Sequence, residues 1–451
     1  MKQVVNDLRL NLKGQKRPCD LSFDGPQISS DGGAILLKSI DDEAGISDRI
    51  SMSLHDDRDM AKVSHTRKEQ VAQRIYQICL GYEDQNDADF LRDDPILKMC
   101  CGLKPNGDSH LSCQSSLSRF ENSVEPNHLM ALLHDFENEY VDRLSKDQKE
   151  VILDIDTSSC PTYGGQQLTL FHGYYKTYMY HPVFVFDGRS GEIISLLLRG
   201  GTTHASRGAV GILTRLIRKI RKKCLQTKII IRGDGGFCVP KLHERLDQLN
   251  CELKHVEYVF GLATNKVLQK LSKAQKEEAA SSYEESGVNV RHFHEFNYAA
   301  QTWSKERRVI AKSEHNSHGS NQRFIVTNIA YGSAEERYDY YCERGQAENY
   351  IKDLKNAMYA GRLSCTTYAA NSFRLLLHGW AYRIMIRLRE RAKKCNLEVG
   401  RLQFDTLRLR LLKVAAQTLE SVRRIKVVLP SVFPLAAAFQ QILLSSTQQP
   451  Q

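Results

Sequence analysis

Three acidic residues stand where a protein could hold divalent cations against a phosphate group. Asp156 ends the apolar run VILDID, Asp234 ends the run KIIIRGD, and Glu348 lies in ERGQAENYIKDLKN. A carboxylate at a strand end can be held rigidly while it faces a cleft. Mg²⁺ needs few protein oxygens, because substrate phosphate and water complete its octahedron. Two such ions can promote an in-line displacement at phosphorus, so the acids indicate phosphoryl transfer with two Mg²⁺ ions, or Mn²⁺ in their place.

Each acid also has a plainer interpretation. An Asp at a strand end is more often a turn residue or a helix cap, and the two glycines after Asp234 would suit a simple turn. Asp154 lies two residues before Asp156 and on the same strand face, so it is an alternative first metal ligand. We prefer Asp156, because it lies nearer the strand end.

A helical pattern around Glu348 places polar and apolar residues in two adjacent stripes. At 100° per residue, four polar side chains fall within about 60° of one another: Tyr341, Arg344, Glu348 and Lys355. The neighbouring apolar stripe consists of Tyr340, Ala347, Ile351, Leu354 and Met358. Burial of the apolar stripe would bring the polar row to the edge of a cleft. The alternative is a row of intrahelical ion pairs, each worth about 0.2–0.5 kcal/mol.

The distribution of apolar residues predicts a mixed α/β fold. Strand-like runs begin at Val151 and alternate with amphipathic helical patterns. The expected strands are 151–156, 178–187, 192–200, 228–234 and 257–263, and the expected helices are 67–82, 128–144, 206–223, 239–250 and 334–358. We divide the chain into a mostly helical N-terminal region (1–147), a sheet domain (148–365) with an inserted block at about 266–321, and a basic helical C-terminal region (366–451).

The positive charge is concentrated near the C-terminus. The chain carries a net charge of +10, and residues 366–451 hold 14 Lys and Arg against 4 Asp and Glu, whereas the other 365 residues carry 49 of each sign. Such a local surplus indicates a surface for a polyanion, or simply a solvated helix face. With the basic helix 206–223, the residues expected to neutralise phosphates are Arg374, Arg383, Arg387, Arg401, Arg408, Arg410, Arg423 and Arg424.

Composition excludes several classes of protein. Hydrophobic residues make up 41% of the chain, and no run approaches the roughly 18 apolar residues of a membrane span. The N-terminal residues show no apolar core of the signal-peptide kind, so we expect a cytoplasmic protein with no membrane partner. No Cys-x-x-Cys pair occurs among the 12 cysteines, so we do not expect a structural zinc site.

These motifs together resemble a known enzyme family. The spacing from Tyr341 through Arg344 and Glu348 to Lys355 matches the YREK signature of a superfamily of bacterial insertion-sequence transposases. The runs LDIDTSSCPTYG, YHPVFVFD, LLRGGTTHAS, RGDGGFC, EYVFGLATNK and ERGQAENYIKDLKN are similar to the DDE domain of insertion sequence family 1380. The resemblance covers roughly residues 30–390. It implies an RNase H-like catalytic domain with a β-rich insertion, in which Asp156, Asp234 and Glu348 are the catalytic, metal-binding acids.

The resemblance also implies roles for further residues. Arg344 and Lys355 would contact DNA phosphates near the cut, and Tyr341 would support the terminal phosphate. Trp303, in the inserted block, would stack on an extruded base, or else it packs on the sheet of the insertion. His204 would touch DNA or activate water, or else it is an ordinary residue at a helix entry.

The expected activity is cut-and-paste transposition. Mg²⁺-dependent hydrolysis at the terminal inverted repeats would be followed by attack of the freed 3′-hydroxyl on target DNA, and one acidic triad can serve both phosphoryl transfers. The expected partner is double-stranded DNA, whose terminal inverted repeats the N-terminal region (1–147) would read. A dimer would bridge the two ends, and the enzyme would be nucleoid-associated when bound. The alternatives are an RNase H-like nuclease without strand transfer, a catalytically silent DNA-binding protein derived from a transposase, and a helical scaffold with incidental acids.

Overall fold

The computed structural model describes residues 7–447, which form two compact units. The larger unit consists of Gly45–Val63 and Leu117–Arg387. The smaller unit combines three segments: the residues up to Ala44, Ser64–Ser116, and the residues from Leu388 onward. Packing therefore joins segments that are far apart in the sequence. The three functional regions expected from the sequence (1–147, 148–365 and 366–451) have other boundaries than these two units and stay a prediction.

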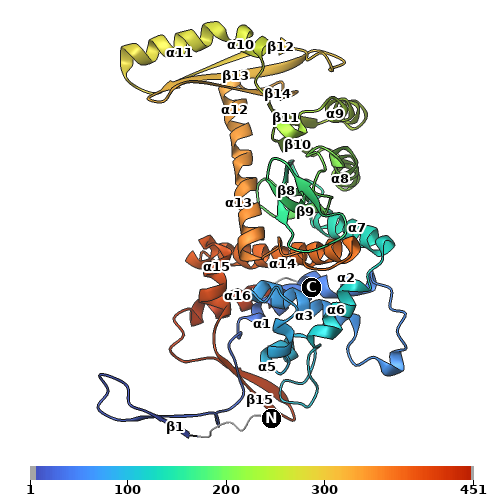
Figure 1. Ribbon diagram of the computed structural model, residues 1–451, viewed down its shortest axis with the longest axis vertical. Coiled ribbons are helices and arrows are strands. Elements are labelled where there is room, and N and C mark those ends of the chain that lie inside the picture. The colour runs from blue at the N-terminus through green and yellow to red at the C-terminus, as the bar shows by residue number, and fades with distance from the viewer. Residues whose placement is uncertain (1–6, 448–451) are drawn as a thin grey trace. The chain divides into compact units, whose positions relative to one another are not determined.

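The larger unit is built on an eight-stranded mixed sheet with the order β12-β13-β14-β11-β10-β4-β8-β9 (Figure 1). Strand β10 runs parallel to β4 and β11, and the other neighbours are antiparallel. The mixed α/β prediction is confirmed, and the strands predicted between residues 151 and 263 include β4, β8, β9, β10 and β11. The strands are β4 (Glu150–Thr157), β8 (Val183–Asp187), β9 (Ile193–Leu197), β10 (Lys228–Gly233), β11 (Val256–Leu262), β12 (Val290–Tyr298), β13 (Arg307–Asn316) and β14 (Gly319–Thr327).

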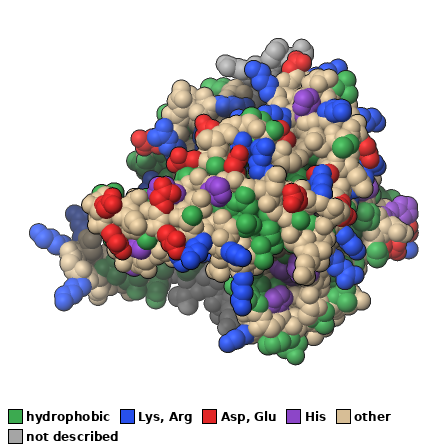
Figure 2. Space-filling model, turned by 90° about the horizontal axis from the view of Figure 1, so that it is seen from above, with side chains coloured by type: hydrophobic (Ala, Val, Ile, Leu, Met, Phe, Trp, Pro, Cys, Tyr) green, Lys and Arg blue, Asp and Glu red, His purple; other side chains and the backbone are tan. Residues whose placement is uncertain are grey.

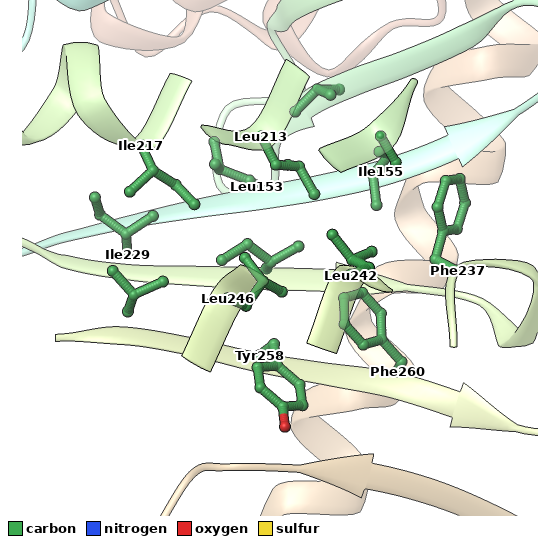
Figure 3. Packing of buried hydrophobic residues seen from close by; sticks show 14 of the residues in the cluster. Leu153, Ile155, Leu213, Ile217, Ile229, Phe237, Leu242, Leu246, Tyr258 and Phe260 are labelled. Atoms are coloured by element: carbon green, nitrogen blue, oxygen red, sulfur yellow. The ribbon is translucent and has the colours of Figure 1, made fainter. Parts of the chain in front are cut away.

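Two amphipathic helices cover one face of this sheet, α8 (Ala209–Lys223) and α9 (Pro240–Leu253) (Figure 1). Leu213 and Ile217 of α8 recur at a spacing of four, so they lie on one side of the helix and pack on the strands. Figure 3 shows these side chains with Leu242 and Leu246 of α9 against the residues of β4, β10 and β11. Complete burial of each such side chain contributes about 1.5–3 kcal/mol.

A long helical segment lies on the opposite face (Figure 1). It begins at the capping box of Ser333 and Glu336, and Tyr338 packs there against Val259 and Ile310. The predicted helix 334–358 is confirmed in position, but its pitch changes twice. The segment consists of α12 (Ala334–Cys342), a 3₁₀ turn (Glu343–Gly345), α13 (Gln346–Lys352) and a π-helical turn (Asp353–Ala357).

The block at about 266–321 extends the main sheet. After α10 (Lys266–Leu271) and α11 (Lys273–Ser286), β12 to β14 form a meander, and β14 pairs directly with β11. The polar run HNSHGSNQ (315–322) belongs mostly to strands, since β13 continues to Asn316 and β14 begins at Gly319. The φ angle of Gly319 is +99°, a conformation that glycine adopts without strain and that permits the tight turn.

Smaller elements complete the larger unit. Between β4 and β8, β5 (Cys160–Pro161), β6 (Leu170–His172) and β7 (Thr177–Tyr180) form a separate three-stranded sheet with the order β5-β7-β6. The other helices are α2 (Ile46–Met52), a 3₁₀ turn at Met60–Lys62, α7 (Pro126–Asp142) and most of α14 (Tyr368–Lys394).

In the smaller unit, strands from both ends of the chain share one sheet. Strand β3 (Ile28–Ser29) pairs with β15 (Ala416–Ser421), which pairs with β16 (Arg424–Val428). Lys413 Nζ donates to Asp31 Oδ1 over 2.6 Å. The remaining elements are β1 (Asp7–Leu10), β2 (Cys19–Ser22), α1 (Ala34–Ala44), α3 (Arg67–Leu80), α4 (Asp87–Phe90), α5 (Pro95–Cys100), α15 (Phe404–Leu407) with a 3₁₀ turn before it (Glu398–Arg401) and a π-helical turn after it (Arg408–Leu412), and α16 (Ala436–Thr447); α6 (Gln114–Asn122) spans the division between the units.

The C-terminal arginines do not form one basic surface. Arg374 and Arg383 are buried and paired with Glu121 and Glu139, and Arg387 also binds Glu139. Arg408 donates to a backbone carbonyl. The expectation that these four neutralise phosphates is therefore wrong, because each is committed to a partner inside the protein. Those exposed to solvent are Arg401, Arg410, Arg423 and Arg424. On the face that Figure 2 shows, acidic and basic side chains are interspersed. Among residues 7–447, no helix combines the length and apolar character needed to cross a bilayer.

The Glu121–Arg374 pair provides a test of this packing. Glu121→Gln should lower the free energy of unfolding by about 3–5 kcal/mol, because it leaves the buried Arg374 charge uncompensated. Urea denaturation of the full chain would measure this. Glu277→Gln, in an exposed pair with Lys273, is the matched control and should change little. Equal stabilities of the two variants would contradict this account of the buried arginines.

Candidate active site

The pairing of two parallel strands brings the first two acids together. In the register of β4 and β10, Arg232 lies opposite Asp154 and Gly233 lies opposite Ile155. Asp156 and Asp234 are the next residues, at or just beyond the strand ends. Because neighbouring strands are about 4.8 Å apart, the two carboxylates leave the same edge of the sheet side by side.

A pocket of about 340 Å³ opens at this edge. It contains all three candidate acids, Asp156, Asp234 and Glu348, although they come from two strands and a helix. The lining residues are Asp156, Thr157, Ser158, Asp234, Arg344, Glu348, Ile351, Lys352, Lys355 and Asn356. Three carboxylates therefore share one pocket with Arg344, Lys352 and Lys355.

Asp156 is the most buried of the three acids. Its carboxylate accepts a hydrogen bond from the Thr157 N–H over 2.7 Å. Burial is the main cause that raises the pKa of Asp156 to about 6, and the negative charges of Asp234 and Glu348 add to the increase. The Thr157 N–H and Arg344 act in the opposite direction. A cationic ligand would therefore relieve an unfavourable concentration of negative charge.

The Asp234 carboxylate has two neighbours, the turn that follows β10 and the pocket. Its carboxylate accepts from the Gly236 N–H over 2.9 Å, which makes it the cap of a 3₁₀ turn at Gly235–Phe237 as well as part of the pocket wall. Tyr341 approaches the same edge, because a Cβ atom at Gly261 would lie only 2.6 Å from the Tyr341 hydroxyl oxygen. Glycine at position 261 therefore allows Tyr341 to reach the end of β11, beside Asp234.

Asp154 is committed to a buried ion pair outside the pocket. Arg232 donates to both of its carboxylate oxygens, over 2.6 and 2.8 Å, and each side chain is only 1% exposed. The remaining Arg232 nitrogen donates to the Tyr340 carbonyl and to Glu343. One arginine thus joins β4, β10 and the helical segment. Asp154 therefore has a structural partner, whereas Asp156 faces the pocket.

Arg344 lies in the 3₁₀ turn at Glu343–Gly345. The Arg344 guanidinium lies 5.6 Å from the Tyr341 ring centre and 3.8 Å from a Glu348 carboxylate oxygen. Its Nε is buried and has no hydrogen-bond partner within the described protein. Glu348 is 62% exposed, so its carboxylate stands at the open side of the pocket.

Lys355 lies in the π-helical turn at the other end of the row. Its Nζ donates to the Ser159 carbonyl over 2.8 Å, which holds the ammonium group at the pocket wall. Ile351 and Leu354 are buried, as are Ala347 and Met358, so the apolar stripe predicted beside the polar row faces the protein interior. π-Helical turns are uncommon and occur frequently at functional sites.

Two predicted DNA contacts lie elsewhere. Trp303 packs edge-on against His243 and Tyr298, with ring centres 5.3 and 5.5 Å apart, and adjoins the main apolar core. His204 is exposed, and its Nδ1 is 2.9 Å from the Ser206 hydroxyl oxygen. Neither side chain is among the described residues that line the pocket.

The donor atoms in the pocket suit a hard cation. All three acids offer carboxylate oxygens, the ligands that Mg²⁺ and Mn²⁺ prefer. Among residues 7–447, no three His, Cys, Asp or Glu side chains are close enough together to hold one ion. Mg²⁺ is often bound by one or two carboxylates with phosphate and water, so the donor set fits ions shared between carboxylate pairs.

Sequence reasoning missed several residues of the site. Lys352 and Asn356 line the pocket without a recognisable motif, and they are one helical turn apart. Tyr175 also belongs to the surroundings of the acids, since the charges of Asp156 and Asp234 contribute, after burial, to a raised pKa of its phenol. The only sequence signal for Tyr175 was the high density of aromatic residues near it.

The sequence matches the family described as Transposase DDE domain group 1 over residues 12–450. No curated protein matches it. Among solved structures, the chain is similar to the cryo-EM structure of the piggyBac transposase synaptic complex with hairpin DNA. That similarity has a TM-score of 0.45 and 10% sequence identity, and it covers 93% of this chain and 82% of the other.

The raised pKa of Asp156 predicts a pH-dependent stability. Between its ordinary value of 3.8 and about 6, the folded state binds more protons than the unfolded state, so stability falls as the pH rises through this window. In EDTA, Asp156→Asn should therefore stabilise the protein by roughly 2–3 kcal/mol at about pH 7.5 and much less at about pH 4.5. Urea denaturation at both pH values measures the difference. A constant difference would contradict the raised pKa.

Proposed function

The chain belongs to the Transposase DDE domain group 1 family, and we propose that it cuts and joins DNA at the pocket of Asp156, Asp234 and Glu348. The observation that carries the proposal is the convergence of these three acids in one pocket, although 78 and 114 positions separate them in the sequence. Carboxylates gathered from two strand ends and a helix repel one another, and bound cations would offset that repulsion.

The proposed reaction has two steps. Water first hydrolyses a phosphodiester at each end of the element, which frees a 3′-hydroxyl, and this hydroxyl then attacks a phosphodiester of the target DNA. In each step one P–O bond forms as another breaks, so one site can perform both. Asp156, Asp234 and Glu348 would hold two Mg²⁺ ions, or Mn²⁺, which when bound supply activation of the attacking oxygen and charge stabilisation at phosphorus.

The cationic residues of the pocket would position the DNA. Arg344 offers a planar guanidinium that can bind phosphate oxygens in a bidentate manner, and its buried Nε has no hydrogen-bond partner among residues 7–447. Lys355 supplies a point charge that the Ser159 carbonyl holds in place. Tyr341, packed beside Gly261 and Asp234, would support the terminal phosphate through its hydroxyl. These contacts orient the strand without reading its sequence.

Several finer assignments are part of the same proposal. We assign the chain to insertion sequence family 1380, with terminal inverted repeats and target DNA as its partners and a dimer that bridges the two ends. Exposed C-terminal arginines such as Arg423 and Arg424 remain available for phosphates. The main alternative is a nuclease that cuts without joining, and the second is a silent DNA-binding derivative. The pocket disfavours the second alternative, since all three acids are retained.

Removal of one carboxylate should abolish cleavage. Glu348→Gln keeps the size of the side chain and removes its charge, so Mg²⁺-dependent cleavage of DNA that carries the element ends should fall at least a hundredfold. Because Glu348 is 62% exposed, the variant should fold normally. Glu285→Gln, an exposed acid of α11, is the matched control and should cleave like the wild type. Cleavage by the Glu348 variant at the wild-type rate would remove the catalytic assignment.

Joining can be tested separately from cutting. DNA ends that are already cut, with a free 3′-hydroxyl, should be inserted into a target plasmid by the wild-type protein in Mg²⁺ or Mn²⁺. Arg344→Lys should reduce joining about tenfold or more, because a lysine cannot form the bidentate phosphate contact. Gel analysis of the joined products measures both results. Cleavage without any joined product would identify the nuclease alternative.

A further inference from the structure

An exposed group of aromatic side chains projects beside the pocket. We call residues 161–178 the aromatic lobe; it leaves β4 just after the pocket residues Thr157 and Ser158. The exposed fractions are 95% for Tyr163, 51% for Phe171, 84% for Tyr174, 41% for Tyr175 and 58% for Tyr178. Large apolar side chains gathered on a surface usually mark a binding site, since their exposure is unfavourable in water.

The rings are held against one another. Tyr174 and Tyr175 meet edge to face with ring centres 5.0 Å apart, and Phe171 meets Tyr178 in the same way at 5.5 Å. His172 lies 5.0 Å from Tyr175. Edge-to-face contacts are a favoured arrangement for aromatic rings, so the lobe presents ordered ring faces to the solvent.

The base of the lobe is anchored to the rest of the larger unit. Gln167 N donates to the Thr366 carbonyl over 2.9 Å, Tyr368 N donates to Gln167 Oε1 over 3.0 Å, and the Tyr180 hydroxyl donates to the Gln167 carbonyl over 2.6 Å. Gly201 lies so close that a Cβ there would be 2.2 Å from the Met179 carbonyl oxygen. The exposed rings therefore stand on a fixed support and need little ordering when they bind a partner.

The lobe adjoins the acids directly. Lys355, which lines the pocket, donates to the carbonyl of Ser159 at the start of the lobe. Ser158, which lines the pocket, donates its backbone N–H to the Pro182 carbonyl, and the ring of the preceding residue, His181, lies 6.3 Å from the Tyr175 ring. A DNA strand that leaves the pocket on the side of Ser158 would therefore pass beside Tyr175 and its neighbour Tyr174.

The charge of the lobe also suits a nucleic acid. Between Cys160 and His181, Lys176 is the only Lys, Arg, Asp or Glu, so no carboxylate of the lobe repels a phosphate. Aromatic side chains bind unpaired bases by stacking and tolerate any sequence, because every base has a π-face. Trp303, the aromatic residue expected from the sequence, instead packs on His243 and Tyr298.

We propose that the aromatic lobe binds unpaired bases of the DNA strand next to the scissile phosphate, by stacking on Tyr174 and Tyr175. The proposal rests on the function proposed above and extends it, because it assigns a locally unpaired duplex as the preferred substrate. Opening of the duplex beside the cut frees the strand to enter the pocket, and stacking on the lobe offsets the lost pairing and stacking of its bases. The continuity of the lobe with the pocket favours DNA over a second copy of the chain.

The test uses full-length protein in EDTA, so that no cleavage occurs. The probes are a duplex with a short unpaired tract that contains 2-aminopurine and a fully paired duplex of the same length. Wild-type protein should quench the fluorescence of the unpaired tract and bind that duplex more tightly. Tyr174→Ala should weaken binding of the unpaired duplex about tenfold and leave binding of the paired duplex unchanged. Because Tyr174 is 84% exposed, the variant should fold normally.

Matched variants separate stacking from other effects. Tyr174→Phe keeps the ring and should bind within twofold of the wild type, and Phe90→Ala removes a ring that is 91% exposed on the other unit and should have no effect. Equal binding by wild type and Tyr174→Ala would overturn the proposal, as would equal weakening on both duplexes. A lower sedimentation mass for Tyr174→Ala without DNA would also overturn it, since the lobe would then join two copies. Because this binding test needs neither metal nor cleavage, a failure of the catalytic assignment would leave its result interpretable.

Discussion

The geometry of the pocket depends on one buried guanidinium. Arg232 binds both oxygens of Asp154 on the adjacent strand and also binds the Tyr340 carbonyl and Glu343 of the helical segment. Each partner lies one to four residues before a pocket residue on the same strand or helical segment. A shift of the helix along the sheet would break hydrogen bonds to a buried charge, which is costly, so the helix has one favourable position. Glu348, on the same helical segment, is thereby held opposite Asp156 and Asp234 in the pocket.

The changes of helical pitch have a role in the same arrangement. A regular α-helix from residue 334 to 358 would rotate its side chains by a constant 100° per residue. The 3₁₀ turn at Glu343–Gly345 and the π-helical turn at Asp353–Ala357 alter that rotation on either side of Glu348. Arg344 and Lys355 lie in these two turns. The helix therefore brings both cations to the pocket while Leu354 and its apolar neighbours stay buried.

Much of this organisation was predictable, and the missing parts share a physical cause. Apolar periodicity gave the strands, the helices and the two stripes around Glu348, because such patterns are local in the sequence. The partners of Arg383 and of Arg232 were not predictable, since each depends on which distant carboxylate the fold brings close. For the same reason the C-terminal arginines suggested a DNA-binding surface, although several of them bind carboxylates inside the protein. The position of Trp303 was not predictable either, because tertiary packing alone decides between burial and a role in binding.

The pairing of β3 with β15 has a consequence for biosynthesis. Residues 28–29 must wait for their neighbours at 416–417 to be synthesised before the sheet of the smaller unit can form. At about 5–20 residues per second, ribosomes need on the order of tens of seconds to bridge that interval. The larger unit, whose main segment ends at Arg387, can complete its core sooner. A nascent chain can thus form the pocket of Asp156, Asp234 and Glu348 first and the smaller unit only near the end of translation.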